Sequence, residues 1–422
     1  MLRMNRCLVV CAALALFTSR APVRAASDTE PWILDANNAQ EGKDLLPPPV
    51  FKHLEKGDYW FKVVPVDPKK LLTNYTKKFW DSTASNEGKY DLDDKQCGLL
   101  DKATGKIPDF VLGYPFPKID PKDPKAGCKI AWNFTFANAM GGGGGATFTL
   151  NGIDTTGEFR RIKAFIHSQI IQGSLNGKPA ENPENIAAQG VTAALEPQDA
   201  EGVSLLNKRF WDTESQDAIW AYVPSTRRAR RVNAASRSDP VGGLDIFADD
   251  LNCYAGKVEY YNWKVVGEGK VLAPIISPTP FIEKQSAERP TKYDIETPYL
   301  KAGYEVPGSK GVPWWIQENL QFIPRPVWIV EGQSSDPYYN FGKVIMYFDK
   351  ELYRIYWKLV HNRAGEYFYT AGCGYHFVKT PDDTHSSVFP SLVIGVNDKI
   401  NRAALGGLVI SVPSSTLRRP RR

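Results

Sequence analysis

Long apolar segments are scarce in this 422-residue sequence. The apolar run at 7–17 is too short to cross a bilayer, which takes about 20 residues, and no later segment is long and apolar enough. Arg3 and Arg6 precede this run, and the small residues Val23 and Ala25 occupy the positions that a signal peptidase recognises. We therefore predict that residues 1–25 are a signal peptide, cleaved near Ala25, and that the exported protein has no membrane-spanning segment.

A strong excess of one charge is also missing. The predicted signal removes Arg3, Arg6, Arg20 and Arg24, so 48 of the 52 basic residues remain against 47 acidic residues. This near balance argues against nucleic acid as a partner, because nucleic-acid-binding proteins carry a basic footprint. The basic run at 416–422 is typical of a solvated tail.

Histidine is scarce, and the chemistry that depends on it is poorly represented. The five histidines are His53, His167, His361, His376 and His385. None forms the two-histidine helix motif of a zinc protease, and Cys373 with His376 lacks the second pair that a zinc site needs. A nucleophile elbow is absent, and the glycine run at 141–145 has no phosphate-loop lysine, so we interpret it as a flexible hairpin loop. The sequence therefore predicts no metal, no cofactor and no catalytic motif.

Cysteine is limited to six residues, of which Cys97, Cys128, Cys253 and Cys373 follow the predicted signal. An even number in an exported chain predicts disulfides, with three possible pairings. We favour Cys97 with Cys128, because the segment between them is rich in Pro, Gly and Lys and gains stability from closure of its loop. Cys253 and Cys373 form the second candidate pair, although either is also compatible with a buried free thiol.

Stretches with a sustained helical period are few. Residues 67–80 form one, and 182–199 form another, where Asn182 and Pro183 fit the start of a helix. The 31 prolines, 34 glycines and 12% aromatic content instead favour many strands and turns. Alternating β-branched and aromatic residues predict strands at 129–136, 146–151, 157–171, 218–232, 256–274, 326–332, 342–349, 352–360 and 366–378.

The predicted strands are long and carry aromatic residues on one face, as Trp220 and Tyr222 illustrate. Short turns at 349–350 and 362–365 are expected to join the last three strands as a meander. Long, twisted strands with one apolar face either close into a barrel or curl over a covering element. We predict a mainly β fold with some helix, as one domain over 26–415, in which a large curved antiparallel sheet encloses an apolar cavity.

Several short motifs occur in an order that resembles the domain-of-unknown-function family numbered 1329. They are GYPFP at 113–117, GCKIAWN at 127–133, RRIK at 160–163, WAYVP at 220–224, RRARRV at 227–232, YNWK at 261–264 and RPVWIVE at 325–331. The resemblance spans roughly residues 50–380. It departs from the family pattern at Ser225 and Thr226, where a glycine is common, and in the glycine run at 141–145.

Members of that family are exported proteins of Gram-negative bacteria, similar to outer-membrane lipoprotein-sorting carriers of the LolA kind. The resemblance implies a half-barrel with helical lid segments that shelters an acyl chain or another lipid, located in the periplasm or at the periphery of the outer membrane. It further implies an inner-membrane exporter or an outer-membrane protein as partner. It implies no established reaction.

The arginine cluster at 227–231 has two interpretations. In a strand, Arg228 and Arg230 point to the side opposite Arg227 and Arg231. Inward guanidiniums at the mouth of a cavity would hold the anionic head of an amphiphile. Alternatively, the arginines pair with nearby acids and pin the following loop, because buried charges are generally paired. The acids in question are Asp239, Asp245, Asp249 and Asp250.

Aromatic residues on the predicted strands are candidates for a cavity wall. They are Trp132, Trp220, Tyr222, Tyr261, Trp263, Trp328 and Trp357. An ordinary core face has the same sequence pattern, so both interpretations stay open. The adjacent pair Trp314 and Trp315 is compatible with a tip that touches a membrane or a partner, and equally with a packed loop corner.

Three functions are compatible with these features. A carrier or chaperone for a hydrophobic ligand is favoured, in part by analogy of fold. A hydrolase that uses paired carboxylates such as Asp249 and Asp250 is an alternative, since glycosidases need two carboxyls across a cleft. The third is a structural envelope protein without catalytic activity.

Overall fold

The computed structural model describes residues 30–282, 284–285, 293–294 and 298–409. The predicted signal peptide and the predicted basic tail at 416–422 lie outside the described residues.

One large sheet organises the described part of the chain and contains sixteen strands. Its order is β1 (Trp32–Leu34), β2 (Phe61–Val63), β17 (Gln321–Ser334), β18 (Lys343–Asp349), β19 (Ile355–His361), β20 (Tyr367–Lys379), β21 (Ser386–Asn397), β22 (Arg402–Val409), β5 (Gly143–Asp154), β6 (Gly157–Ile170), β7 (Ile186–Glu196), β8 (Ser204–Phe210), β9 (Ala218–Val223) and β10 (Arg228–Val232). β11 (Tyr261–Ile275) pairs with β17, and both β11 and β12 (Phe281–Ile282) meet β20 in parallel. Apart from the parallel contacts of β20 with β11 and β12 and that of β2 with β17, neighbouring strands are antiparallel. The predicted large, mainly antiparallel sheet is therefore confirmed.

The described residues also form three small sheets and several helices outside this large sheet. The sheets pair β3 (Tyr90–Leu92) with β4 (Leu99–Asp101), β13 (Lys284–Gln285) with β14 (Tyr293–Asp294) and β15 (Lys301–Ala302) with β16 (Ile316–Glu318). The α-helices are α1 (Pro48–Glu55), α2 (Pro68–Leu72), α3 (Lys77–Ser85) and α4 (Ala126–Ala139). The 3-10 helices are η1 (Ala36–Gly42), η2 (Pro224–Thr226), η3 (Ala234–Ser238), η4 (Ala248–Cys253), η5 (Val258–Tyr260) and η6 (Gly303–Glu305).

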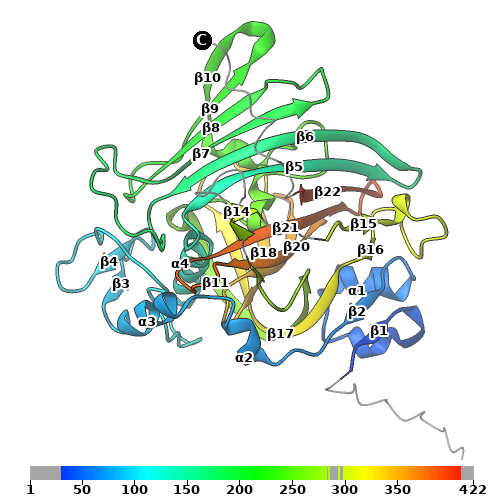
Figure 1. The fold of residues 1–422 in the computed structure, drawn as a ribbon, viewed down its shortest axis with the longest axis horizontal. Coiled ribbons are helices and arrows are strands. Elements are labelled where there is room, and N and C mark those ends of the chain that lie inside the picture. The colour runs from blue at the N-terminus through cyan, green and yellow to red at the C-terminus, as the bar shows by residue number, and fades with distance from the viewer. Residues whose placement is uncertain (1–29, 283, 286–292, 295–297, 410–422) are drawn as a thin grey trace, which may run out of the picture.

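The strand predictions for the second half of the chain are largely confirmed. The predicted meander is present as β18, β19 and β20, of which Figure 1 labels β18 and β20. Its first turn occupies 350–354 rather than the predicted 349–350. The prediction at 218–232 needs a correction, because it is a hairpin of β9 and β10 rather than one strand. The chain turns there at η2 and at Arg227, whose φ is +50°.

The predicted helix at 67–80 is divided into two. Asp67 caps α2 by accepting a hydrogen bond from Lys69 N, and Pro68 is the first helical residue. Thr76 then caps α3 by accepting from Phe79 N. Helix α2 therefore ends at its C-cap Thr73, and α3 begins as a separate helix at its own N-cap.

Two predicted elements have the wrong type. The strand predicted at 129–136 is helix α4, which is buried on nearly all sides and therefore has no polar stripe to reveal its helical period. The helix predicted at 182–199 is strand β7, which pairs with both β6 and β8. Asn182 does not cap a helix there, since its side chain accepts from Ile186 N at 3.0 Å in a turn.

The glycine run at 141–145 spans the end of the link from α4 and the first three residues of β5, and is not the hairpin loop predicted between two strands. Gly143 has φ +97°, and a Cβ at this position would lie 2.3 Å from Ser168 O on β6. Only glycine fits such a close backbone approach in this conformation. The run therefore lets the chain leave the buried helix and enter the sheet directly.

The meander strands are covered on both faces. Helix α4 packs against one face, where Phe134 meets Phe348 edge-on with ring centroids 5.7 Å apart. Segment η4 lies on the same face and is joined to β20 by the disulfide between Cys253 and Cys373. On the opposite face, α1 and Trp315 lie against Trp357. These strands consequently form the core of the molecule.

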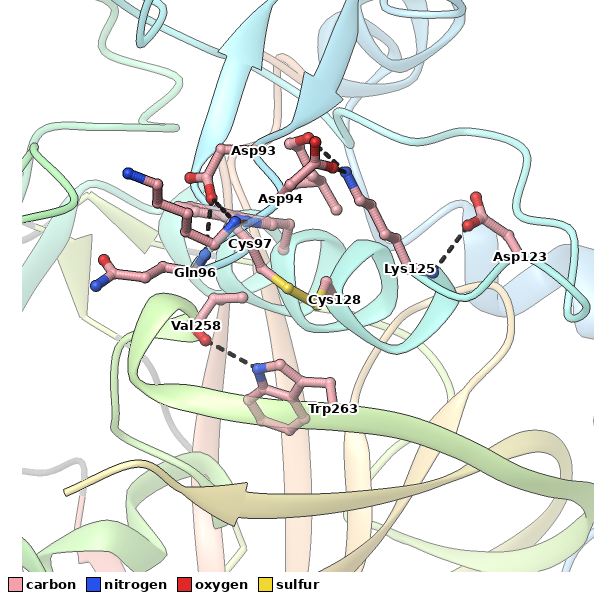
Figure 2. Close-up of a disulfide and its surroundings, with 12 residues drawn as sticks. Asp93, Asp94, Gln96, Cys97, Asp123, Lys125, Cys128, Val258 and Trp263 are labelled. Carbon is pink, nitrogen blue, oxygen red and sulfur yellow. Dashed lines mark hydrogen bonds and ion pairs between the residues drawn. A yellow bond between two sulfur atoms is a disulfide. The ribbon is translucent and has the colours of Figure 1, made fainter. Parts of the chain in front are cut away.

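The favoured disulfide between Cys97 and Cys128 is also present (Figure 2). It ties the loop that precedes β4 to the first turns of α4, and Trp132 donates from Nε1 to Cys97 O at 2.7 Å beside it. Figure 2 places Trp263 close to this disulfide, with its indole donating to Val258 O at 2.9 Å. The N-terminal part of α4 is therefore anchored both to a surface hairpin and to the main sheet.

Candidate functional site

Strands β6 to β10 form a region that we call the wing. They arch over the rest of the chain at the top of Figure 1. In contrast to the meander strands, most side chains of β7 to β10 are half-buried or exposed. Because successive side chains of a strand point to opposite faces, both faces of the wing are accessible, and both carry apolar residues.

The cross-strand register defines one face, which we call the Trp220 face. Trp220 lies opposite Leu206 on β8, and Leu206 lies opposite Val191 on β7. On the other side, Trp220 lies opposite Arg231 on β10. The next row on this face runs from Phe165 through Ala193 and Ser204 to Tyr222. The face therefore combines an apolar stripe with a guanidinium at the free edge of the sheet.

Polar pairs border the apolar stripe of the Trp220 face. Gln169 and Gln189 lie opposite each other, and their side chains are hydrogen-bonded at 2.9 Å. Lys208 follows Leu206 two residues later and pairs with Glu184 at 2.6 Å. The guanidinium of Arg231 differs from these groups, because it has no carboxylate partner among the described residues. An apolar stripe beside an unpaired cation is suited to an amphiphile with an anionic head.

The predicted binding residues Arg228 and Arg230 lie on the opposite face, which we call the Arg230 face. Arg230 lies opposite Ala221, and Arg228 lies opposite Val223. Both arginines are exposed. The structure therefore brings Trp220 and Tyr222 together on one face but does not bring Arg228 and Arg230 to it.

The acids proposed as partners of these arginines pair with other groups. Asp249 accepts from Arg237 Nε at 3.1 Å, and Asp250 pairs with Lys358 Nζ at 2.6 Å. Asp245 pairs with Arg402, and Asp239 accepts from Asn340. The idea that Arg228 and Arg230 are neutralised by these four acids is therefore wrong.

Asp249 and Asp250, the carboxylates considered for a hydrolase, belong to a buried ionic cluster. Each is 1% exposed. Asp249 also accepts from the hydroxyl of Tyr339, and Asp250 accepts from the hydroxyl of Tyr369 at 2.6 Å and from Phe247 N at 2.8 Å. Burial and the neighbouring carboxylates raise the pKa of both tyrosines well above the usual value, so both remain hydrogen-bond donors. This arrangement fixes η4 against the sheet and presents no carboxylate to a cleft.

The remaining aromatic candidates lie in the core. They are Trp132, Tyr261, Trp263, Trp328 and Trp357, all less than 9% exposed. Tyr261 and Trp263 stack with ring centroids 5.2 Å apart, and Trp357 donates from its indole to Leu272 O at 2.8 Å. They pack as core side chains do. Of the aromatic candidates, only Trp220 and Tyr222 lie on the wing.

Trp314 and Trp315 form a packed loop corner and not an exposed tip. Trp315 is 1% exposed. It stacks on Tyr59 with centroids 4.1 Å apart and donates from Nε1 to Trp60 O at 2.7 Å. A role of this pair in touching a membrane is therefore excluded by burial.

A small cavity lies between α1 and the meander. His53, Tyr59, Trp357 and Asp398 are among its lining residues, and it offers room for about one water molecule. His53 bridges two carboxylates, with Nδ1 2.8 Å from Asp58 Oδ2 and Nε2 2.8 Å from Asp398 Oδ1. The cavity is too small for an acyl chain.

The residues that the structure describes contain no group of three or more His, Cys, Asp or Glu side chains arranged to hold a metal ion. No helix in the same residues is both long and apolar enough to span a bilayer.

Sequence reasoning missed Phe165, Val191, Leu206 and Arg231 as parts of one face. Val191 lies in the segment 182–199 that was predicted as a helix, and no strand was predicted at 204–210. The β-branched pair at Val191 and Thr192, directly after a glycine, was the available signal for a strand at this point.

This chain matches the model of a known protein family. The model of the family described as "Protein of unknown function (DUF1329)" matches residues 33–388. The chain belongs to the DUF1329 family. A comparison with curated protein sequences found no match.

Several solved structures are similar to this DUF1329 chain. A putative outer membrane lipoprotein-sorting protein domain from Vibrio parahaemolyticus is 15% identical, with a TM-score of 0.44, over 68% of this chain and 92% of that one. A DUF1329 family protein from Desulfovibrio piger is 10% identical, with a TM-score of 0.44, over 68% and 91%. The LolA superfamily protein NE2245 from Nitrosomonas europaea is 10% identical, with a TM-score of 0.37, over 65% and 89%. These sequence identities and TM-scores are too low to transfer a function to this chain.

Proposed function

We propose that this DUF1329 protein carries an amphiphilic ligand on the Trp220 face of its wing after export to the cell envelope. The observation that supports this proposal most is the row Val191, Leu206, Trp220 and Arg231 across four adjacent strands. The apolar side chains supply a surface for an acyl chain, and Arg231 supplies a cation for an anionic head. An exporter or an outer-membrane protein as donor or acceptor stays an expectation from the family.

The partial exposure of this face is the reason for choosing it over the core. Burying half-exposed Trp220 and Leu206 beneath an acyl chain releases water from apolar surface, which favours binding. The core aromatics are already packed, so a ligand among them would have to displace side chains. The wing accepts a ligand without such a rearrangement.

Native mass spectrometry of the protein purified from the periplasm tests the proposal, followed by solvent extraction and lipid analysis. We expect a stoichiometric amphiphile in the wild type. Arg231→Gln should lower its occupancy, because the variant removes the cation on the Trp220 face. Arg230→Gln is the matched control, since it removes the same charge from the next residue but on the other face.

Two results would contradict this function. One is a wild-type protein that stays ligand-free after incubation with envelope lipids. The other is an equal loss of ligand in Arg230→Gln and Arg231→Gln, which would mean that only the net charge matters.

A further inference from the structure

Exposed apolar side chains gather at one end of the wing, which we call the tip. It comprises the ends of β7 and β9, the starts of β8 and β10 and the turns between them. Gly202 and Pro224 bring the two turns side by side, since a Cβ on Gly202 would lie 3.0 Å from Pro224 Cγ. Large hydrophobic side chains here are each 38% to 41% exposed, namely Leu195, Leu205, Leu206, Tyr222 and Val223.

The apolar side chains of the tip occupy both faces of the sheet. Leu206 and Tyr222 lie on the Trp220 face, whereas Leu205 and Val223 lie on the Arg230 face. A protein partner seated on one face would leave the side chains of the other face in water. A lipid interface that receives the end of the sheet contacts both faces at once.

The tip is also basic. Arg227, Arg228, Arg230 and Arg231 are exposed and have no carboxylate partner among the described residues. The carboxylates at the end of β7 and in its turn are Glu196, which pairs with Lys163, Asp199, which pairs with Arg160, and Glu201. Positive charge is therefore in excess at the tip, and it complements anionic head groups.

From these observations we infer that the tip docks this protein on a lipid bilayer with anionic head groups. The apolar side chains enter the interface from both faces of the sheet, while the arginines contact the head groups. A second copy of the chain is a poorer occupant of the free edge, because a strand with four arginines at or beside it repels an identical strand. This inference goes beyond the proposed function and does not rest on it.

Vesicle flotation with the full exported chain tests the inference. The probes are vesicles of phosphatidylcholine alone and of phosphatidylcholine mixed with phosphatidylglycerol. We expect binding to the anionic vesicles only, and weaker binding in high salt. The double variant Arg228→Gln, Arg230→Gln should bind about 30-fold more weakly, the loss expected for two surface cations. Leu205→Ser with Val223→Ser should also weaken binding, because less apolar surface enters the interface.

Matched controls lie elsewhere on the surface. Lys264→Gln with Lys270→Gln removes two exposed cations from β11, and Val266→Ser with Ile400→Ser removes two exposed apolar side chains. Both control variants should bind as the wild type does. Arg228→Lys with Arg230→Lys should restore most of the binding, which separates loss of charge from misfolding.

Three outcomes would overturn the inference. They are equal binding to neutral and anionic vesicles, controls that lose as much as the tip variants, and self-association through the tip in place of vesicle binding. The proposed carrier function would survive each of them. Conversely, Arg228→Gln with Arg230→Gln should retain the co-purified amphiphile while losing vesicle binding, so the two proposals fail separately.

Discussion

Lys358 Nζ lies 2.6 Å from Asp250 Oδ1 in the interior, and the two side chains are 0% and 1% exposed. Lys358 comes from the meander strand β19, whereas Asp250 comes from η4, which follows the wing in sequence. Lys358 also donates to Asp249 O at 3.1 Å. The ion pair therefore holds η4, the segment that follows the wing in sequence, against the core of the sheet.

Replacement of Lys358 by methionine is expected to destabilise the protein strongly. The variant leaves the buried Asp250 carboxylate without its cation, which typically costs about 3 to 5 kcal/mol. Urea unfolding at neutral pH measures this loss. The double variant Lys358→Met, Asp250→Asn should recover part of the stability, since it also removes the buried charge.

An exposed ion pair is the control for Lys358. Lys77 pairs with Asp81 on the surface of α3, with both side chains more than half exposed. Lys77→Met should change the free energy of unfolding by less than about 1 kcal/mol. An equally small change in Lys358→Met would mean that the buried pair does not hold the fold.

The sequence predicts the antiparallel sheet well because alternation is a local signal. Alternating residues over 342–378 and two short turns were enough to predict the meander, although its strands are buried on both faces. Helix α4 could not be recognised in the same way. Its residues are apolar on nearly every side, so neither a helical nor a strand period dominates.

The candidate site was harder to predict because it depends on register. Alternation alone correctly places Arg231 on the opposite face of the strand from Arg228 and Arg230. Which of them shares a face with Trp220 depends on where the β9–β10 hairpin turns, and this is set by η2 and by Arg227. Three side chains that contact Asp249 and Asp250 come from positions 90 to 119 residues away in the sequence, which no local pattern reports; they are Tyr339, Lys358 and Tyr369.

His53 is expected to make stability depend on pH. Burial lowers its pKa, but the hydrogen bonds with Asp398 and Asp58 and the charges of these carboxylates raise it more, so the folded-state pKa lies above the ordinary value of 6.5. Since carboxylates only accept hydrogen bonds, both ring nitrogens donate in the charged form. The stabilisation is fully present below pH 6.5 and is lost as the pH rises through the folded-state pKa.

Thermal unfolding of the wild type and of His53→Gln, measured from acidic to alkaline pH, checks this expectation. The wild type should be more stable than the variant at low pH, and the difference should shrink as the pH rises. His167→Gln, at an exposed position, should show no such trend. A gap between wild type and His53→Gln that is constant with pH would refute the charged bridge.

The two disulfides are expected to contribute unequally. The bond between Cys253 and Cys373 spans 120 residues, whereas the bond between Cys97 and Cys128 spans 31. Closing the longer loop removes more entropy from the unfolded chain, so replacing both cysteines by serine should cost about 5 kcal/mol for the former and about 4 kcal/mol for the latter. Urea unfolding of the two double-serine variants measures the order. The reverse order would show that native contacts at the bonds, and not loop length, set their value.

His376 is expected to lower the stability of the folded protein in acid, whereas His53 is expected to raise it. It is 0% exposed, its Nδ1 contacts Ser391 Oγ, and its ring stacks on Phe389 with centroids 5.3 Å apart. Burial lowers its pKa from 6.5 to about 3, because the interior disfavours the charged ring. As the pH falls below 6.5, the unfolded chain takes up a proton that the folded protein rejects, so stability is lost between pH 6.5 and about 3.

Urea unfolding at pH 7 and pH 5 isolates this effect. Between these values His376 should lower the wild-type free energy of unfolding by about 2 kcal/mol. His376→Phe cannot take up a proton in either state, so it should lose about 2 kcal/mol less than the wild type over the same interval, whatever its stability at pH 7. His167→Gln should lose as much as the wild type, because its His376 is intact. If His376→Phe were as acid-sensitive as the wild type, His376 would have to be protonated in the folded protein, with water or a conformational change reaching its buried Nε2.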